Sequence, residues 1–178
     1  MSAVRELSEI RGWVLDAACG TGSMVPLFES GGFEGKLLMI DASGKMVRKA
    51  RERARESGLE VEVILGDVNR LPFKAGCVDG IACIFSITTV RRPVTAISEF
   101  TRCLRGDGKL VVLDSERPEG PVVRLLYPAL VPISRIFCHT HIDRDVERMI
   151  RAGSGWSKRT EKAYFGGMVK LYSFSGQV

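Results

Sequence analysis

The sequence has few of the residues that hold metals or staple small secreted domains. Its 178 residues include two histidines and five cysteines, and no two cysteines form a CxxC pair. An odd number of cysteines, with no secretory signal at the start of the sequence, argues against a disulfide framework and indicates a cytoplasmic location. Because no cysteine spacing is typical of a metal site, we also expect no metal.

Long apolar runs and a strong charge of one sign are absent too. No uninterrupted run reaches the roughly 18 apolar residues that a membrane-spanning helix needs. The net charge is +5 and aromatic residues make up 7% of the chain, without a basic stripe interleaved with aromatics. We therefore expect no nucleic-acid partner. The length and a hydrophobic content of 45% predict one globular domain over residues 1–178.

A glycine turn follows the first apolar segment, in the run Val14-Leu15-Asp16-Ala17-Ala18-Cys19-Gly20-Thr21-Gly22-Ser23. Its glycines allow a sharp turn, and the helix behind it would direct free N–H groups at a ligand. A dinucleotide-binding fingerprint needs a third glycine or alanine where this chain has Val25. Asp16 would repel a pyrophosphate and attract an ammonium or sulfonium group. The turn therefore favours a cationic ligand, and the alternative is a structural turn that Asp16 caps.

Apolar strand-like segments alternate with helical segments along the chain. We expect strands at 13–16, 36–40, 61–65, 77–85 and 109–113, and helices at 23–29, 44–56, 94–104 and 145–152. Gly106-Asp107-Gly108 is expected to end the third of these helices. Residues 158–165 and 168–174 flank a glycine pair and indicate a hairpin. The order predicts an α/β fold with a Rossmann-like doubly wound sheet, mostly parallel, with an antiparallel C-terminal hairpin.

Three of the predicted strands end in an acidic residue, namely Asp16, Asp41 and Asp67. In a parallel sheet the carboxyl ends of the strands lie along one rim, where open α/β sheets bind ligands. An acidic residue after the second strand can accept hydrogen bonds from ribose hydroxyls. The sequence therefore predicts a site for a positively charged nucleoside on this rim.

Residues 117–137 are strongly apolar and interrupted by three prolines within 121–132. We interpret them as a kinked helix that covers the sheet. The alternatives are a lid over a lipophilic substrate and a peripheral membrane contact through 121–137. The segment Cys138-His139-Thr140-His141-Ile142-Asp143 looks like a ligand cluster, but no second cluster accompanies it, and we assign it no metal.

These stretches resemble the class I S-adenosylmethionine-dependent methyltransferases. Residues 15–22 are similar to the first motif of that class, Asp41 to its second, and Gly66-Asp67-Val68 to its adenine-contacting segment. Within the class, the chain resembles the ubiquinone/menaquinone biosynthesis C-methyltransferase family. That resemblance rests on LDAACGTG at 15–22, LPF at 71–73, VDGIACIFSITTV at 78–90, FTRCLRGDGKLVVLDSERP at 100–118 and RLLYPALVP at 124–132.

The resemblance implies S-adenosyl-L-methionine as cofactor and assigns a role to each matching residue. The methionine part would be held by Asp16 and by the turn of Ala18, Cys19, Gly20, Thr21 and Gly22. Asp41 would bind the ribose hydroxyls, and Ala42 and Met46 would lie beside the adenine. Asp67 and Val68 would contact the adenine, and Ser86 would lie beside the methyl group. For a phenolic acceptor, the candidate bases are His139, His141, Asp114 and Glu116, and no catalytic residue is assigned among them.

The chain departs from that family around the acceptor. About 12 residues precede the first motif, Thr88-Thr89 replaces an arginine–asparagine pair, and a tyrosine-rich stretch is largely missing. The resemblance implies a methyltransferase that acts on a small, lipophilic, quinol- or phenol-like acceptor. A non-catalytic cofactor-binding module and an NAD-dependent oxidoreductase stay open as alternatives. A homodimer is a further hypothesis, because a second copy could cover the pocket edge that a short leader leaves open.

Overall fold

The computed structural model describes residues 2–116, 144–153 and 157–175. The apolar segment 117–137, the alternative membrane contact through 121–137, and both histidines of the ligand-like segment lie outside the described residues. None of the helices within the described ranges has the length and apolar character that a bilayer span requires.

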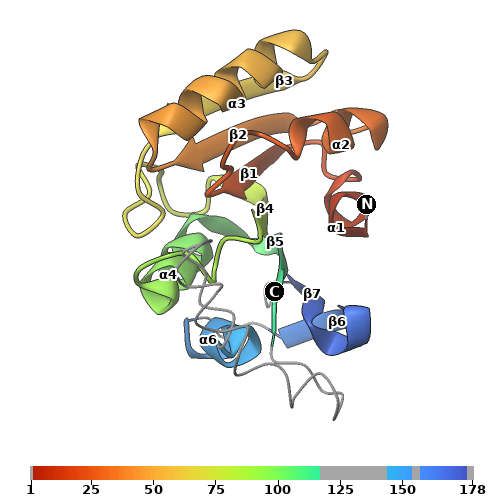
Figure 1. Cartoon of the computed structure of the whole chain (residues 1–178), viewed down its shortest axis with the longest axis vertical. Helices are drawn as coiled ribbons and strands as arrows, with labels where there is room; N and C mark the ends of the chain where they lie inside the picture. The colour runs from red at the N-terminus through yellow and green to blue at the C-terminus, as the bar shows by residue number, and fades with distance from the viewer. Residues whose placement is uncertain (1, 117–143, 154–156, 176–178) are drawn as a thin grey trace.

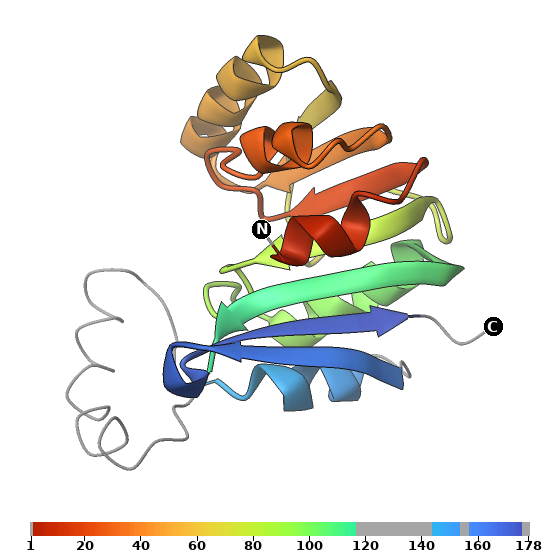
Figure 2. The ribbon, with the colours of Figure 1, turned by 90° about the vertical axis from the view of Figure 1, so that its right-hand side faces the viewer.

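The core of the fold is a seven-stranded sheet with the order β3-β2-β1-β4-β5-β7-β6. The strands are β1 (Trp13–Ala17), β2 (Lys36–Asp41), β3 (Glu60–Leu65), β4 (Val78–Ile84), β5 (Leu104–Ser115), β6 (Ser157–Tyr164) and β7 (Val169–Ser175). Strands β1 to β5 pair in parallel, whereas β7 runs antiparallel to both of its neighbours. The predicted mostly parallel sheet with an antiparallel C-terminal hairpin is therefore confirmed, and Figure 2 shows β7 pointing against the other strands.

Helices cover both faces of the sheet. They are α1 (Ser2–Leu7), α2 (Val25–Ser30), α3 (Gly44–Glu56), α4 (Pro93–Cys103) and α6 (Val146–Gly153), and a 3₁₀ turn, η2 (Phe165–Gly167), joins the hairpin strands. Residues of α4 and α6 share one buried apolar cluster with one face of the sheet, and residues of α1, α2 and α3 share a second cluster with the other face. Figure 1 shows α1 and α2 on one side of the strands and α4 and α6 on the other.

The sequence of each strand reflects how it is covered. Leu37 to Ile40 of β2 are all buried, as a continuous apolar run predicts for a strand with helices on both faces. Strand β3 is at the edge of the sheet, and its residues alternate between more and less exposed positions. The first turn of α3 is capped by Ser43, whose hydroxyl accepts from the Met46 backbone N–H at 3.5 Å.

Two predicted boundaries are wrong. Helix α2 begins at Val25 rather than at Ser23, and no side chain caps its N-terminus. Helix α4 already ends at Cys103, and the predicted helix stop at Gly106-Asp107-Gly108 lies inside β5. There the pairing with β4 jumps from Leu104 to Lys109, which marks a bulge, and glycine is a residue that bulges favour because it tolerates irregular backbone.

Candidate functional site

The glycine turn directly follows β1 and is held in a left-handed conformation at three positions. Ala18, Gly20 and Gly22 have φ of 56°, 54° and 76°. The Cys19 backbone N–H donates to the Ile40 carbonyl at 3.0 Å, which ties the turn to the end of β2. At Gly22 a Cβ would lie 3.1 Å from the Ala50 Cα, so only glycine allows the turn to approach α3 this closely.

Helix α3 also holds the turn through a side chain. The Arg53 guanidinium donates from Nη1 to the Thr21 carbonyl at 3.0 Å and to the Thr21 hydroxyl at 2.9 Å. The turn is thus fixed by β2 on one side and by α3 on the other.

Asp16 lies beneath this turn, near the end of β1, and is 1% exposed. Its Oδ2 atom has no hydrogen-bond partner among the described residues. Burial, with a further contribution from the charge of Asp41, raises the pKa of Asp16 from 3.8 to about 7. A buried carboxylate without a partner is costly, so Asp16 requires either a proton or a cationic ligand group.

Asp41, the last residue of β2, connects two neighbouring segments. Its Oδ2 accepts from the Gly20 N–H at 2.9 Å, and its Oδ1 accepts from the Ser43 N–H at 2.8 Å. One carboxylate therefore joins the glycine turn to the start of α3. Because each carboxylate oxygen has two lone pairs, both still have capacity for a ligand hydroxyl.

Asp67 follows β3 on the same rim. Its Oδ1 accepts from both the backbone N–H and the side-chain amide of Asn69, each at 2.8 Å. Those hydrogen bonds, with the nearby positive charges of Arg92 and Arg91, hold the pKa of Asp67 below its ordinary value. Asp67 therefore stays a charged acceptor, in contrast to Asp16.

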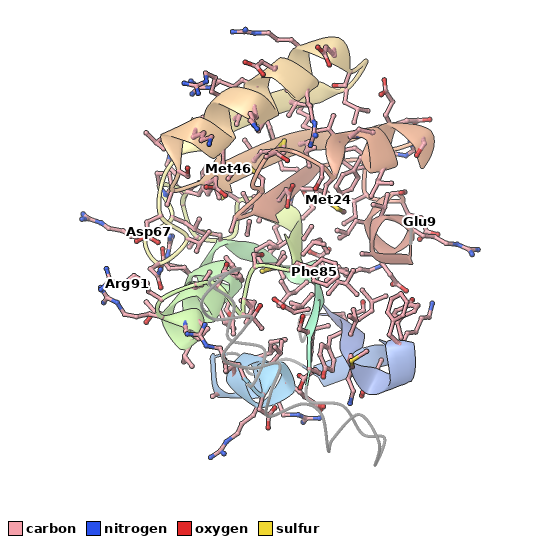
Figure 3. All side chains as sticks on the ribbon, in the orientation of Figure 1. Glu9, Met24, Met46, Asp67, Phe85 and Arg91 are labelled. Carbon is pink, nitrogen blue, oxygen red and sulfur yellow. The ribbon has the colours of Figure 1, made fainter. Side chains whose placement is uncertain are left out.

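A pocket of about 260 Å³ opens between these segments. It is lined by Ala18, Asp41, Ala42, Asp67, Val68, Asn69, Thr89, Val90 and Arg91. Five of these were candidates from the sequence, and they come from the ends of three different strands. The other four are not among the predicted site residues. Asn69 directly follows the Gly66-Asp67-Val68 segment, and Thr89 and Val90 end the 78–90 stretch that carries the family resemblance, so both are usable signals, whereas Arg91 carries no motif. Figure 3 shows Asp67 and Arg91 on the same side of the strand ends.

The remaining candidates lie around this pocket rather than on its wall. Met46 is half-buried in the first turn of α3. Ser86 is buried after β4, and its hydroxyl donates to the Ala17 carbonyl at 3.3 Å. Cys19 is buried within the glycine turn, and burial raises the pKa of its thiol, so it stays protonated and is no nucleophile.

Two of the candidate bases are engaged in structural contacts. Asp114 is fully buried and accepts from the Thr88 hydroxyl at 2.7 Å and from the Thr88 N–H at 3.2 Å. Glu116 accepts from the Tyr172 hydroxyl at 2.9 Å and from the Val146 N–H at the start of α6 at 3.0 Å. Burial raises the pKa of both carboxyl groups. Both stabilise the carboxyl end of β5, and the structure does not single out either as a base.

The described ranges contain no cluster of three or more His, Cys, Asp or Glu side chains that could hold a metal ion. The groups that converge on the rim are instead carboxylates, backbone amides and a glycine turn. This arrangement defines the class of protein as a Rossmann-like α/β protein with its candidate site at the carboxyl ends of the parallel strands.

Comparison with known proteins then identifies the family. Residues 14–108, more than half of the chain, match the family described as methyltransferase domain, and the chain belongs to this family. The ubiquinone/menaquinone biosynthesis C-methyltransferase UbiE of Bordetella parapertussis is 34% identical over 110 residues, which are 61% of this chain and 43% of that protein. UbiE of Azotobacter vinelandii is 27% identical over 94% of this chain and 75% of its own length. The chain thus spans less than half of the Bordetella relative.

Solved structures with the same fold include one that is named a cyclase. The PH0226 protein of Pyrococcus horikoshii is 26% identical with a TM-score of 0.74, over 99% of this chain and 87% of that chain. YcgJ of Bacillus subtilis is 18% identical with a TM-score of 0.76, over 99% of both chains. The [4+2]-cyclase SpnF is 18% identical with a TM-score of 0.80, over 99% of this chain and 79% of its own. Because one neighbour is named a cyclase, the fold by itself does not fix the reaction.

Proposed function

We propose that the chain binds S-adenosyl-L-methionine on this rim and transfers its methyl group to a small lipophilic acceptor. The observation that carries the proposal is Asp16, a buried carboxylate with an oxygen that has no partner, beneath a glycine turn whose Ala18 lines the pocket. S-adenosylmethionine carries an ammonium and a sulfonium group, and either would satisfy this carboxylate. The fit therefore rests on the chemistry of the residues present as well as on the family.

The other strand-end carboxylates suit the rest of such a ligand. Asp41 has free lone pairs for a ribose diol, and Asp67 stays ionised and can accept from an exocyclic amine. Val68 supplies an apolar wall to the pocket between them. Along the sheet, the order of β3, β2 and β1 therefore gives an adenine end, a ribose position and a cationic end.

When bound, the sulfonium supplies an electrophilic methyl group, so little chemistry is left for the protein. The chain has to fix the cofactor, exclude water and align the acceptor. The glycine turn, held by Arg53 and the end of β2, performs the first task. No residue is assigned as a general base.

For the acceptor, we propose a chemical class rather than a particular compound. The names of the relatives mention ubiquinone and menaquinone biosynthesis, which supports a quinol- or phenol-like acceptor for this chain. A non-catalytic cofactor-binding role is the second candidate, because the fold by itself does not fix the reaction. An NAD-dependent oxidoreductase is a weaker fit, because Asp16 would face a pyrophosphate. The cytoplasmic location, the absence of a nucleic-acid partner and a homodimer stay predictions.

Cofactor binding is tested by calorimetry on the full chain with S-adenosylmethionine and S-adenosylhomocysteine. The Asp41→Ala variant should bind either ligand about 5- to 150-fold more weakly, since buried ligand hydroxyls lose a charged acceptor worth about 1–3 kcal/mol. Asp107→Ala, which removes an exposed acid from β5, is the matched control and should bind as the wild type does. Tight binding of NADH, or no binding of either sulfur ligand by the folded wild type, would refute the proposal. Turnover with a phenolic acceptor would then exclude the non-catalytic role.

A further inference from the structure

Phe85, which directly follows β4, combines two features that folding disfavours. Its φ is +51°, in the left-handed region that bulky residues rarely adopt because Cβ crowds the backbone. Its side chain is also 50% exposed, although a phenylalanine gains most from burial. Neither feature is explained by the packing of the core.

The surroundings fix Phe85 in this strained conformation. Its backbone N–H donates to the Leu113 carbonyl of β5 at 2.7 Å. The next residue, Ser86, donates to the Ala17 carbonyl of β1 at 3.3 Å, and Thr88 donates twice to the buried Asp114. These contacts on both sides hold Phe85 in its strained conformation. A strained residue that is held in this way is typical of a position with a function.

The position of Phe85 follows from the strand order. Strand β4 lies next to β1 on the side away from β2 and β3. If Asp67, Asp41 and Asp16 mark the adenine, ribose and cationic ends of the ligand, then the next strand end along the rim holds Phe85. Figure 3 shows Phe85 on the side of Met24, away from Asp67 and Arg91. On this assignment, the strand end that carries Phe85 is the neighbour of the cationic end of the ligand, from which the methyl group is transferred.

We propose that Phe85 determines acceptor specificity by offering its ring face to a planar aromatic acceptor, which stacks on it next to the transferable methyl group. The inference rests on the proposed function and assigns a residue that would select the ring of the quinol- or phenol-like acceptor. An aromatic pair gains a contribution beyond simple burial that amounts to roughly 2- to 12-fold in affinity, and an aliphatic acceptor would not receive it. The strained backbone keeps the ring exposed, because a relaxed backbone would direct the side chain elsewhere.

The first test replaces the ring but keeps apolar volume. With S-adenosylhomocysteine bound, the Phe85→Leu variant should bind 1-naphthol about 2- to 12-fold more weakly than the wild type, and its affinity for S-adenosylhomocysteine should not change. Cyclohexanol, an aliphatic probe, should bind the variant and the wild type alike. Phe165→Leu is the matched control, because Phe165 is also exposed and left-handed at φ +52° but lies at the end of β6, with β5 and β7 between it and β4.

The second test separates strain from simple loss of structure. Asparagine tolerates the left-handed region, so Phe85→Asn should raise the melting temperature by about 2–4 °C while it lowers the affinity for 1-naphthol. Equal affinity of Phe85→Leu and the wild type for 1-naphthol would overturn the inference, as would a wild-type chain that binds S-adenosylhomocysteine but not 1-naphthol. A wild-type chain that does not bind S-adenosylhomocysteine would refute the proposed function itself.

Discussion

The protonation of Asp16 gives the sharpest test of how the site works. This carboxyl is 1% exposed and has an oxygen without a partner, and its pKa is raised to about 7. At pH 6.5, below this pKa, most of the ligand-free molecules should therefore carry a proton on Asp16. A cationic ligand favours the charged carboxylate, so binding should release most of that proton.

The released proton can be counted by calorimetry. Titration of the chain with S-adenosylmethionine at pH 6.5, in buffers with different ionisation enthalpies, should show the release of most of one proton per ligand. At this pH the amino group of the ligand is almost fully protonated, since α-amino groups titrate near pH 7.7–8.0, and so it adds little. The Asp16→Asn variant should release no proton and bind more weakly. A binding enthalpy that does not depend on the buffer would refute this view of Asp16.

The same shift predicts how stability depends on pH without ligand. The folded chain binds a proton at Asp16 more tightly than the unfolded chain, whose pKa is close to 3.8. The folded state therefore holds more protons between pH 3.8 and about 7, and the free energy of unfolding falls as the pH rises through this window. At pH 8 the free energy of unfolding should be about 4 kcal/mol lower than at acidic pH, where Asp16 is protonated in both states. Asp16→Asn should thus resist urea better than the wild type at pH 8 and equally well at pH 4.

Two further substitutions test the supports of the site. Gly22→Ala places a Cβ 3.1 Å from the Ala50 Cα in a left-handed backbone, so it should lower the free energy of unfolding in urea by about 1–3 kcal/mol. In the control Gly106→Ala the added Cβ meets no atom within 4 Å, so the free energy of unfolding should fall less. Equal stability of both variants would contradict the close approach. Thr88→Val removes the hydroxyl that donates to Asp114 at 2.7 Å, and it should lower the free energy of unfolding by about 1–3 kcal/mol. Thr88→Ser keeps a hydroxyl and should restore the stability. An unchanged stability of Thr88→Val would show that this hydrogen bond contributes little.

Much of this fold could be predicted from the sequence because its signals are local. A continuous apolar run such as Leu37 to Ile40 indicates a strand covered on both faces, and the glycine turn after β1 marks the first crossover. The position of Asp16, Asp41 and Asp67 on one rim then follows from parallel pairing. Their protonation did not follow, because the burial that raises the pKa of Asp16 depends on packing from several elements.

The features that were missed depend on contacts far apart in the sequence. The sequence pattern predicts a helix stop at Gly106 and Gly108, but these glycines lie in a bulge that is defined only by pairing with β4. Arg91 carries no motif, and it reaches the pocket because the loop after β4 passes beside Asp67. The left-handed backbone of Phe85 could not be predicted either, since nothing in its neighbours signals a turn.

A crystal structure of the full chain with S-adenosylhomocysteine would test the central claim most directly, namely that an unpartnered buried carboxylate under the glycine turn holds the cationic end of the ligand. We expect the ammonium group within hydrogen-bond distance of Asp16, the ribose hydroxyls on Asp41 and the adenine against Val68 and Asp67. A ligand bound elsewhere, or one whose ammonium group makes no contact with Asp16, would contradict it.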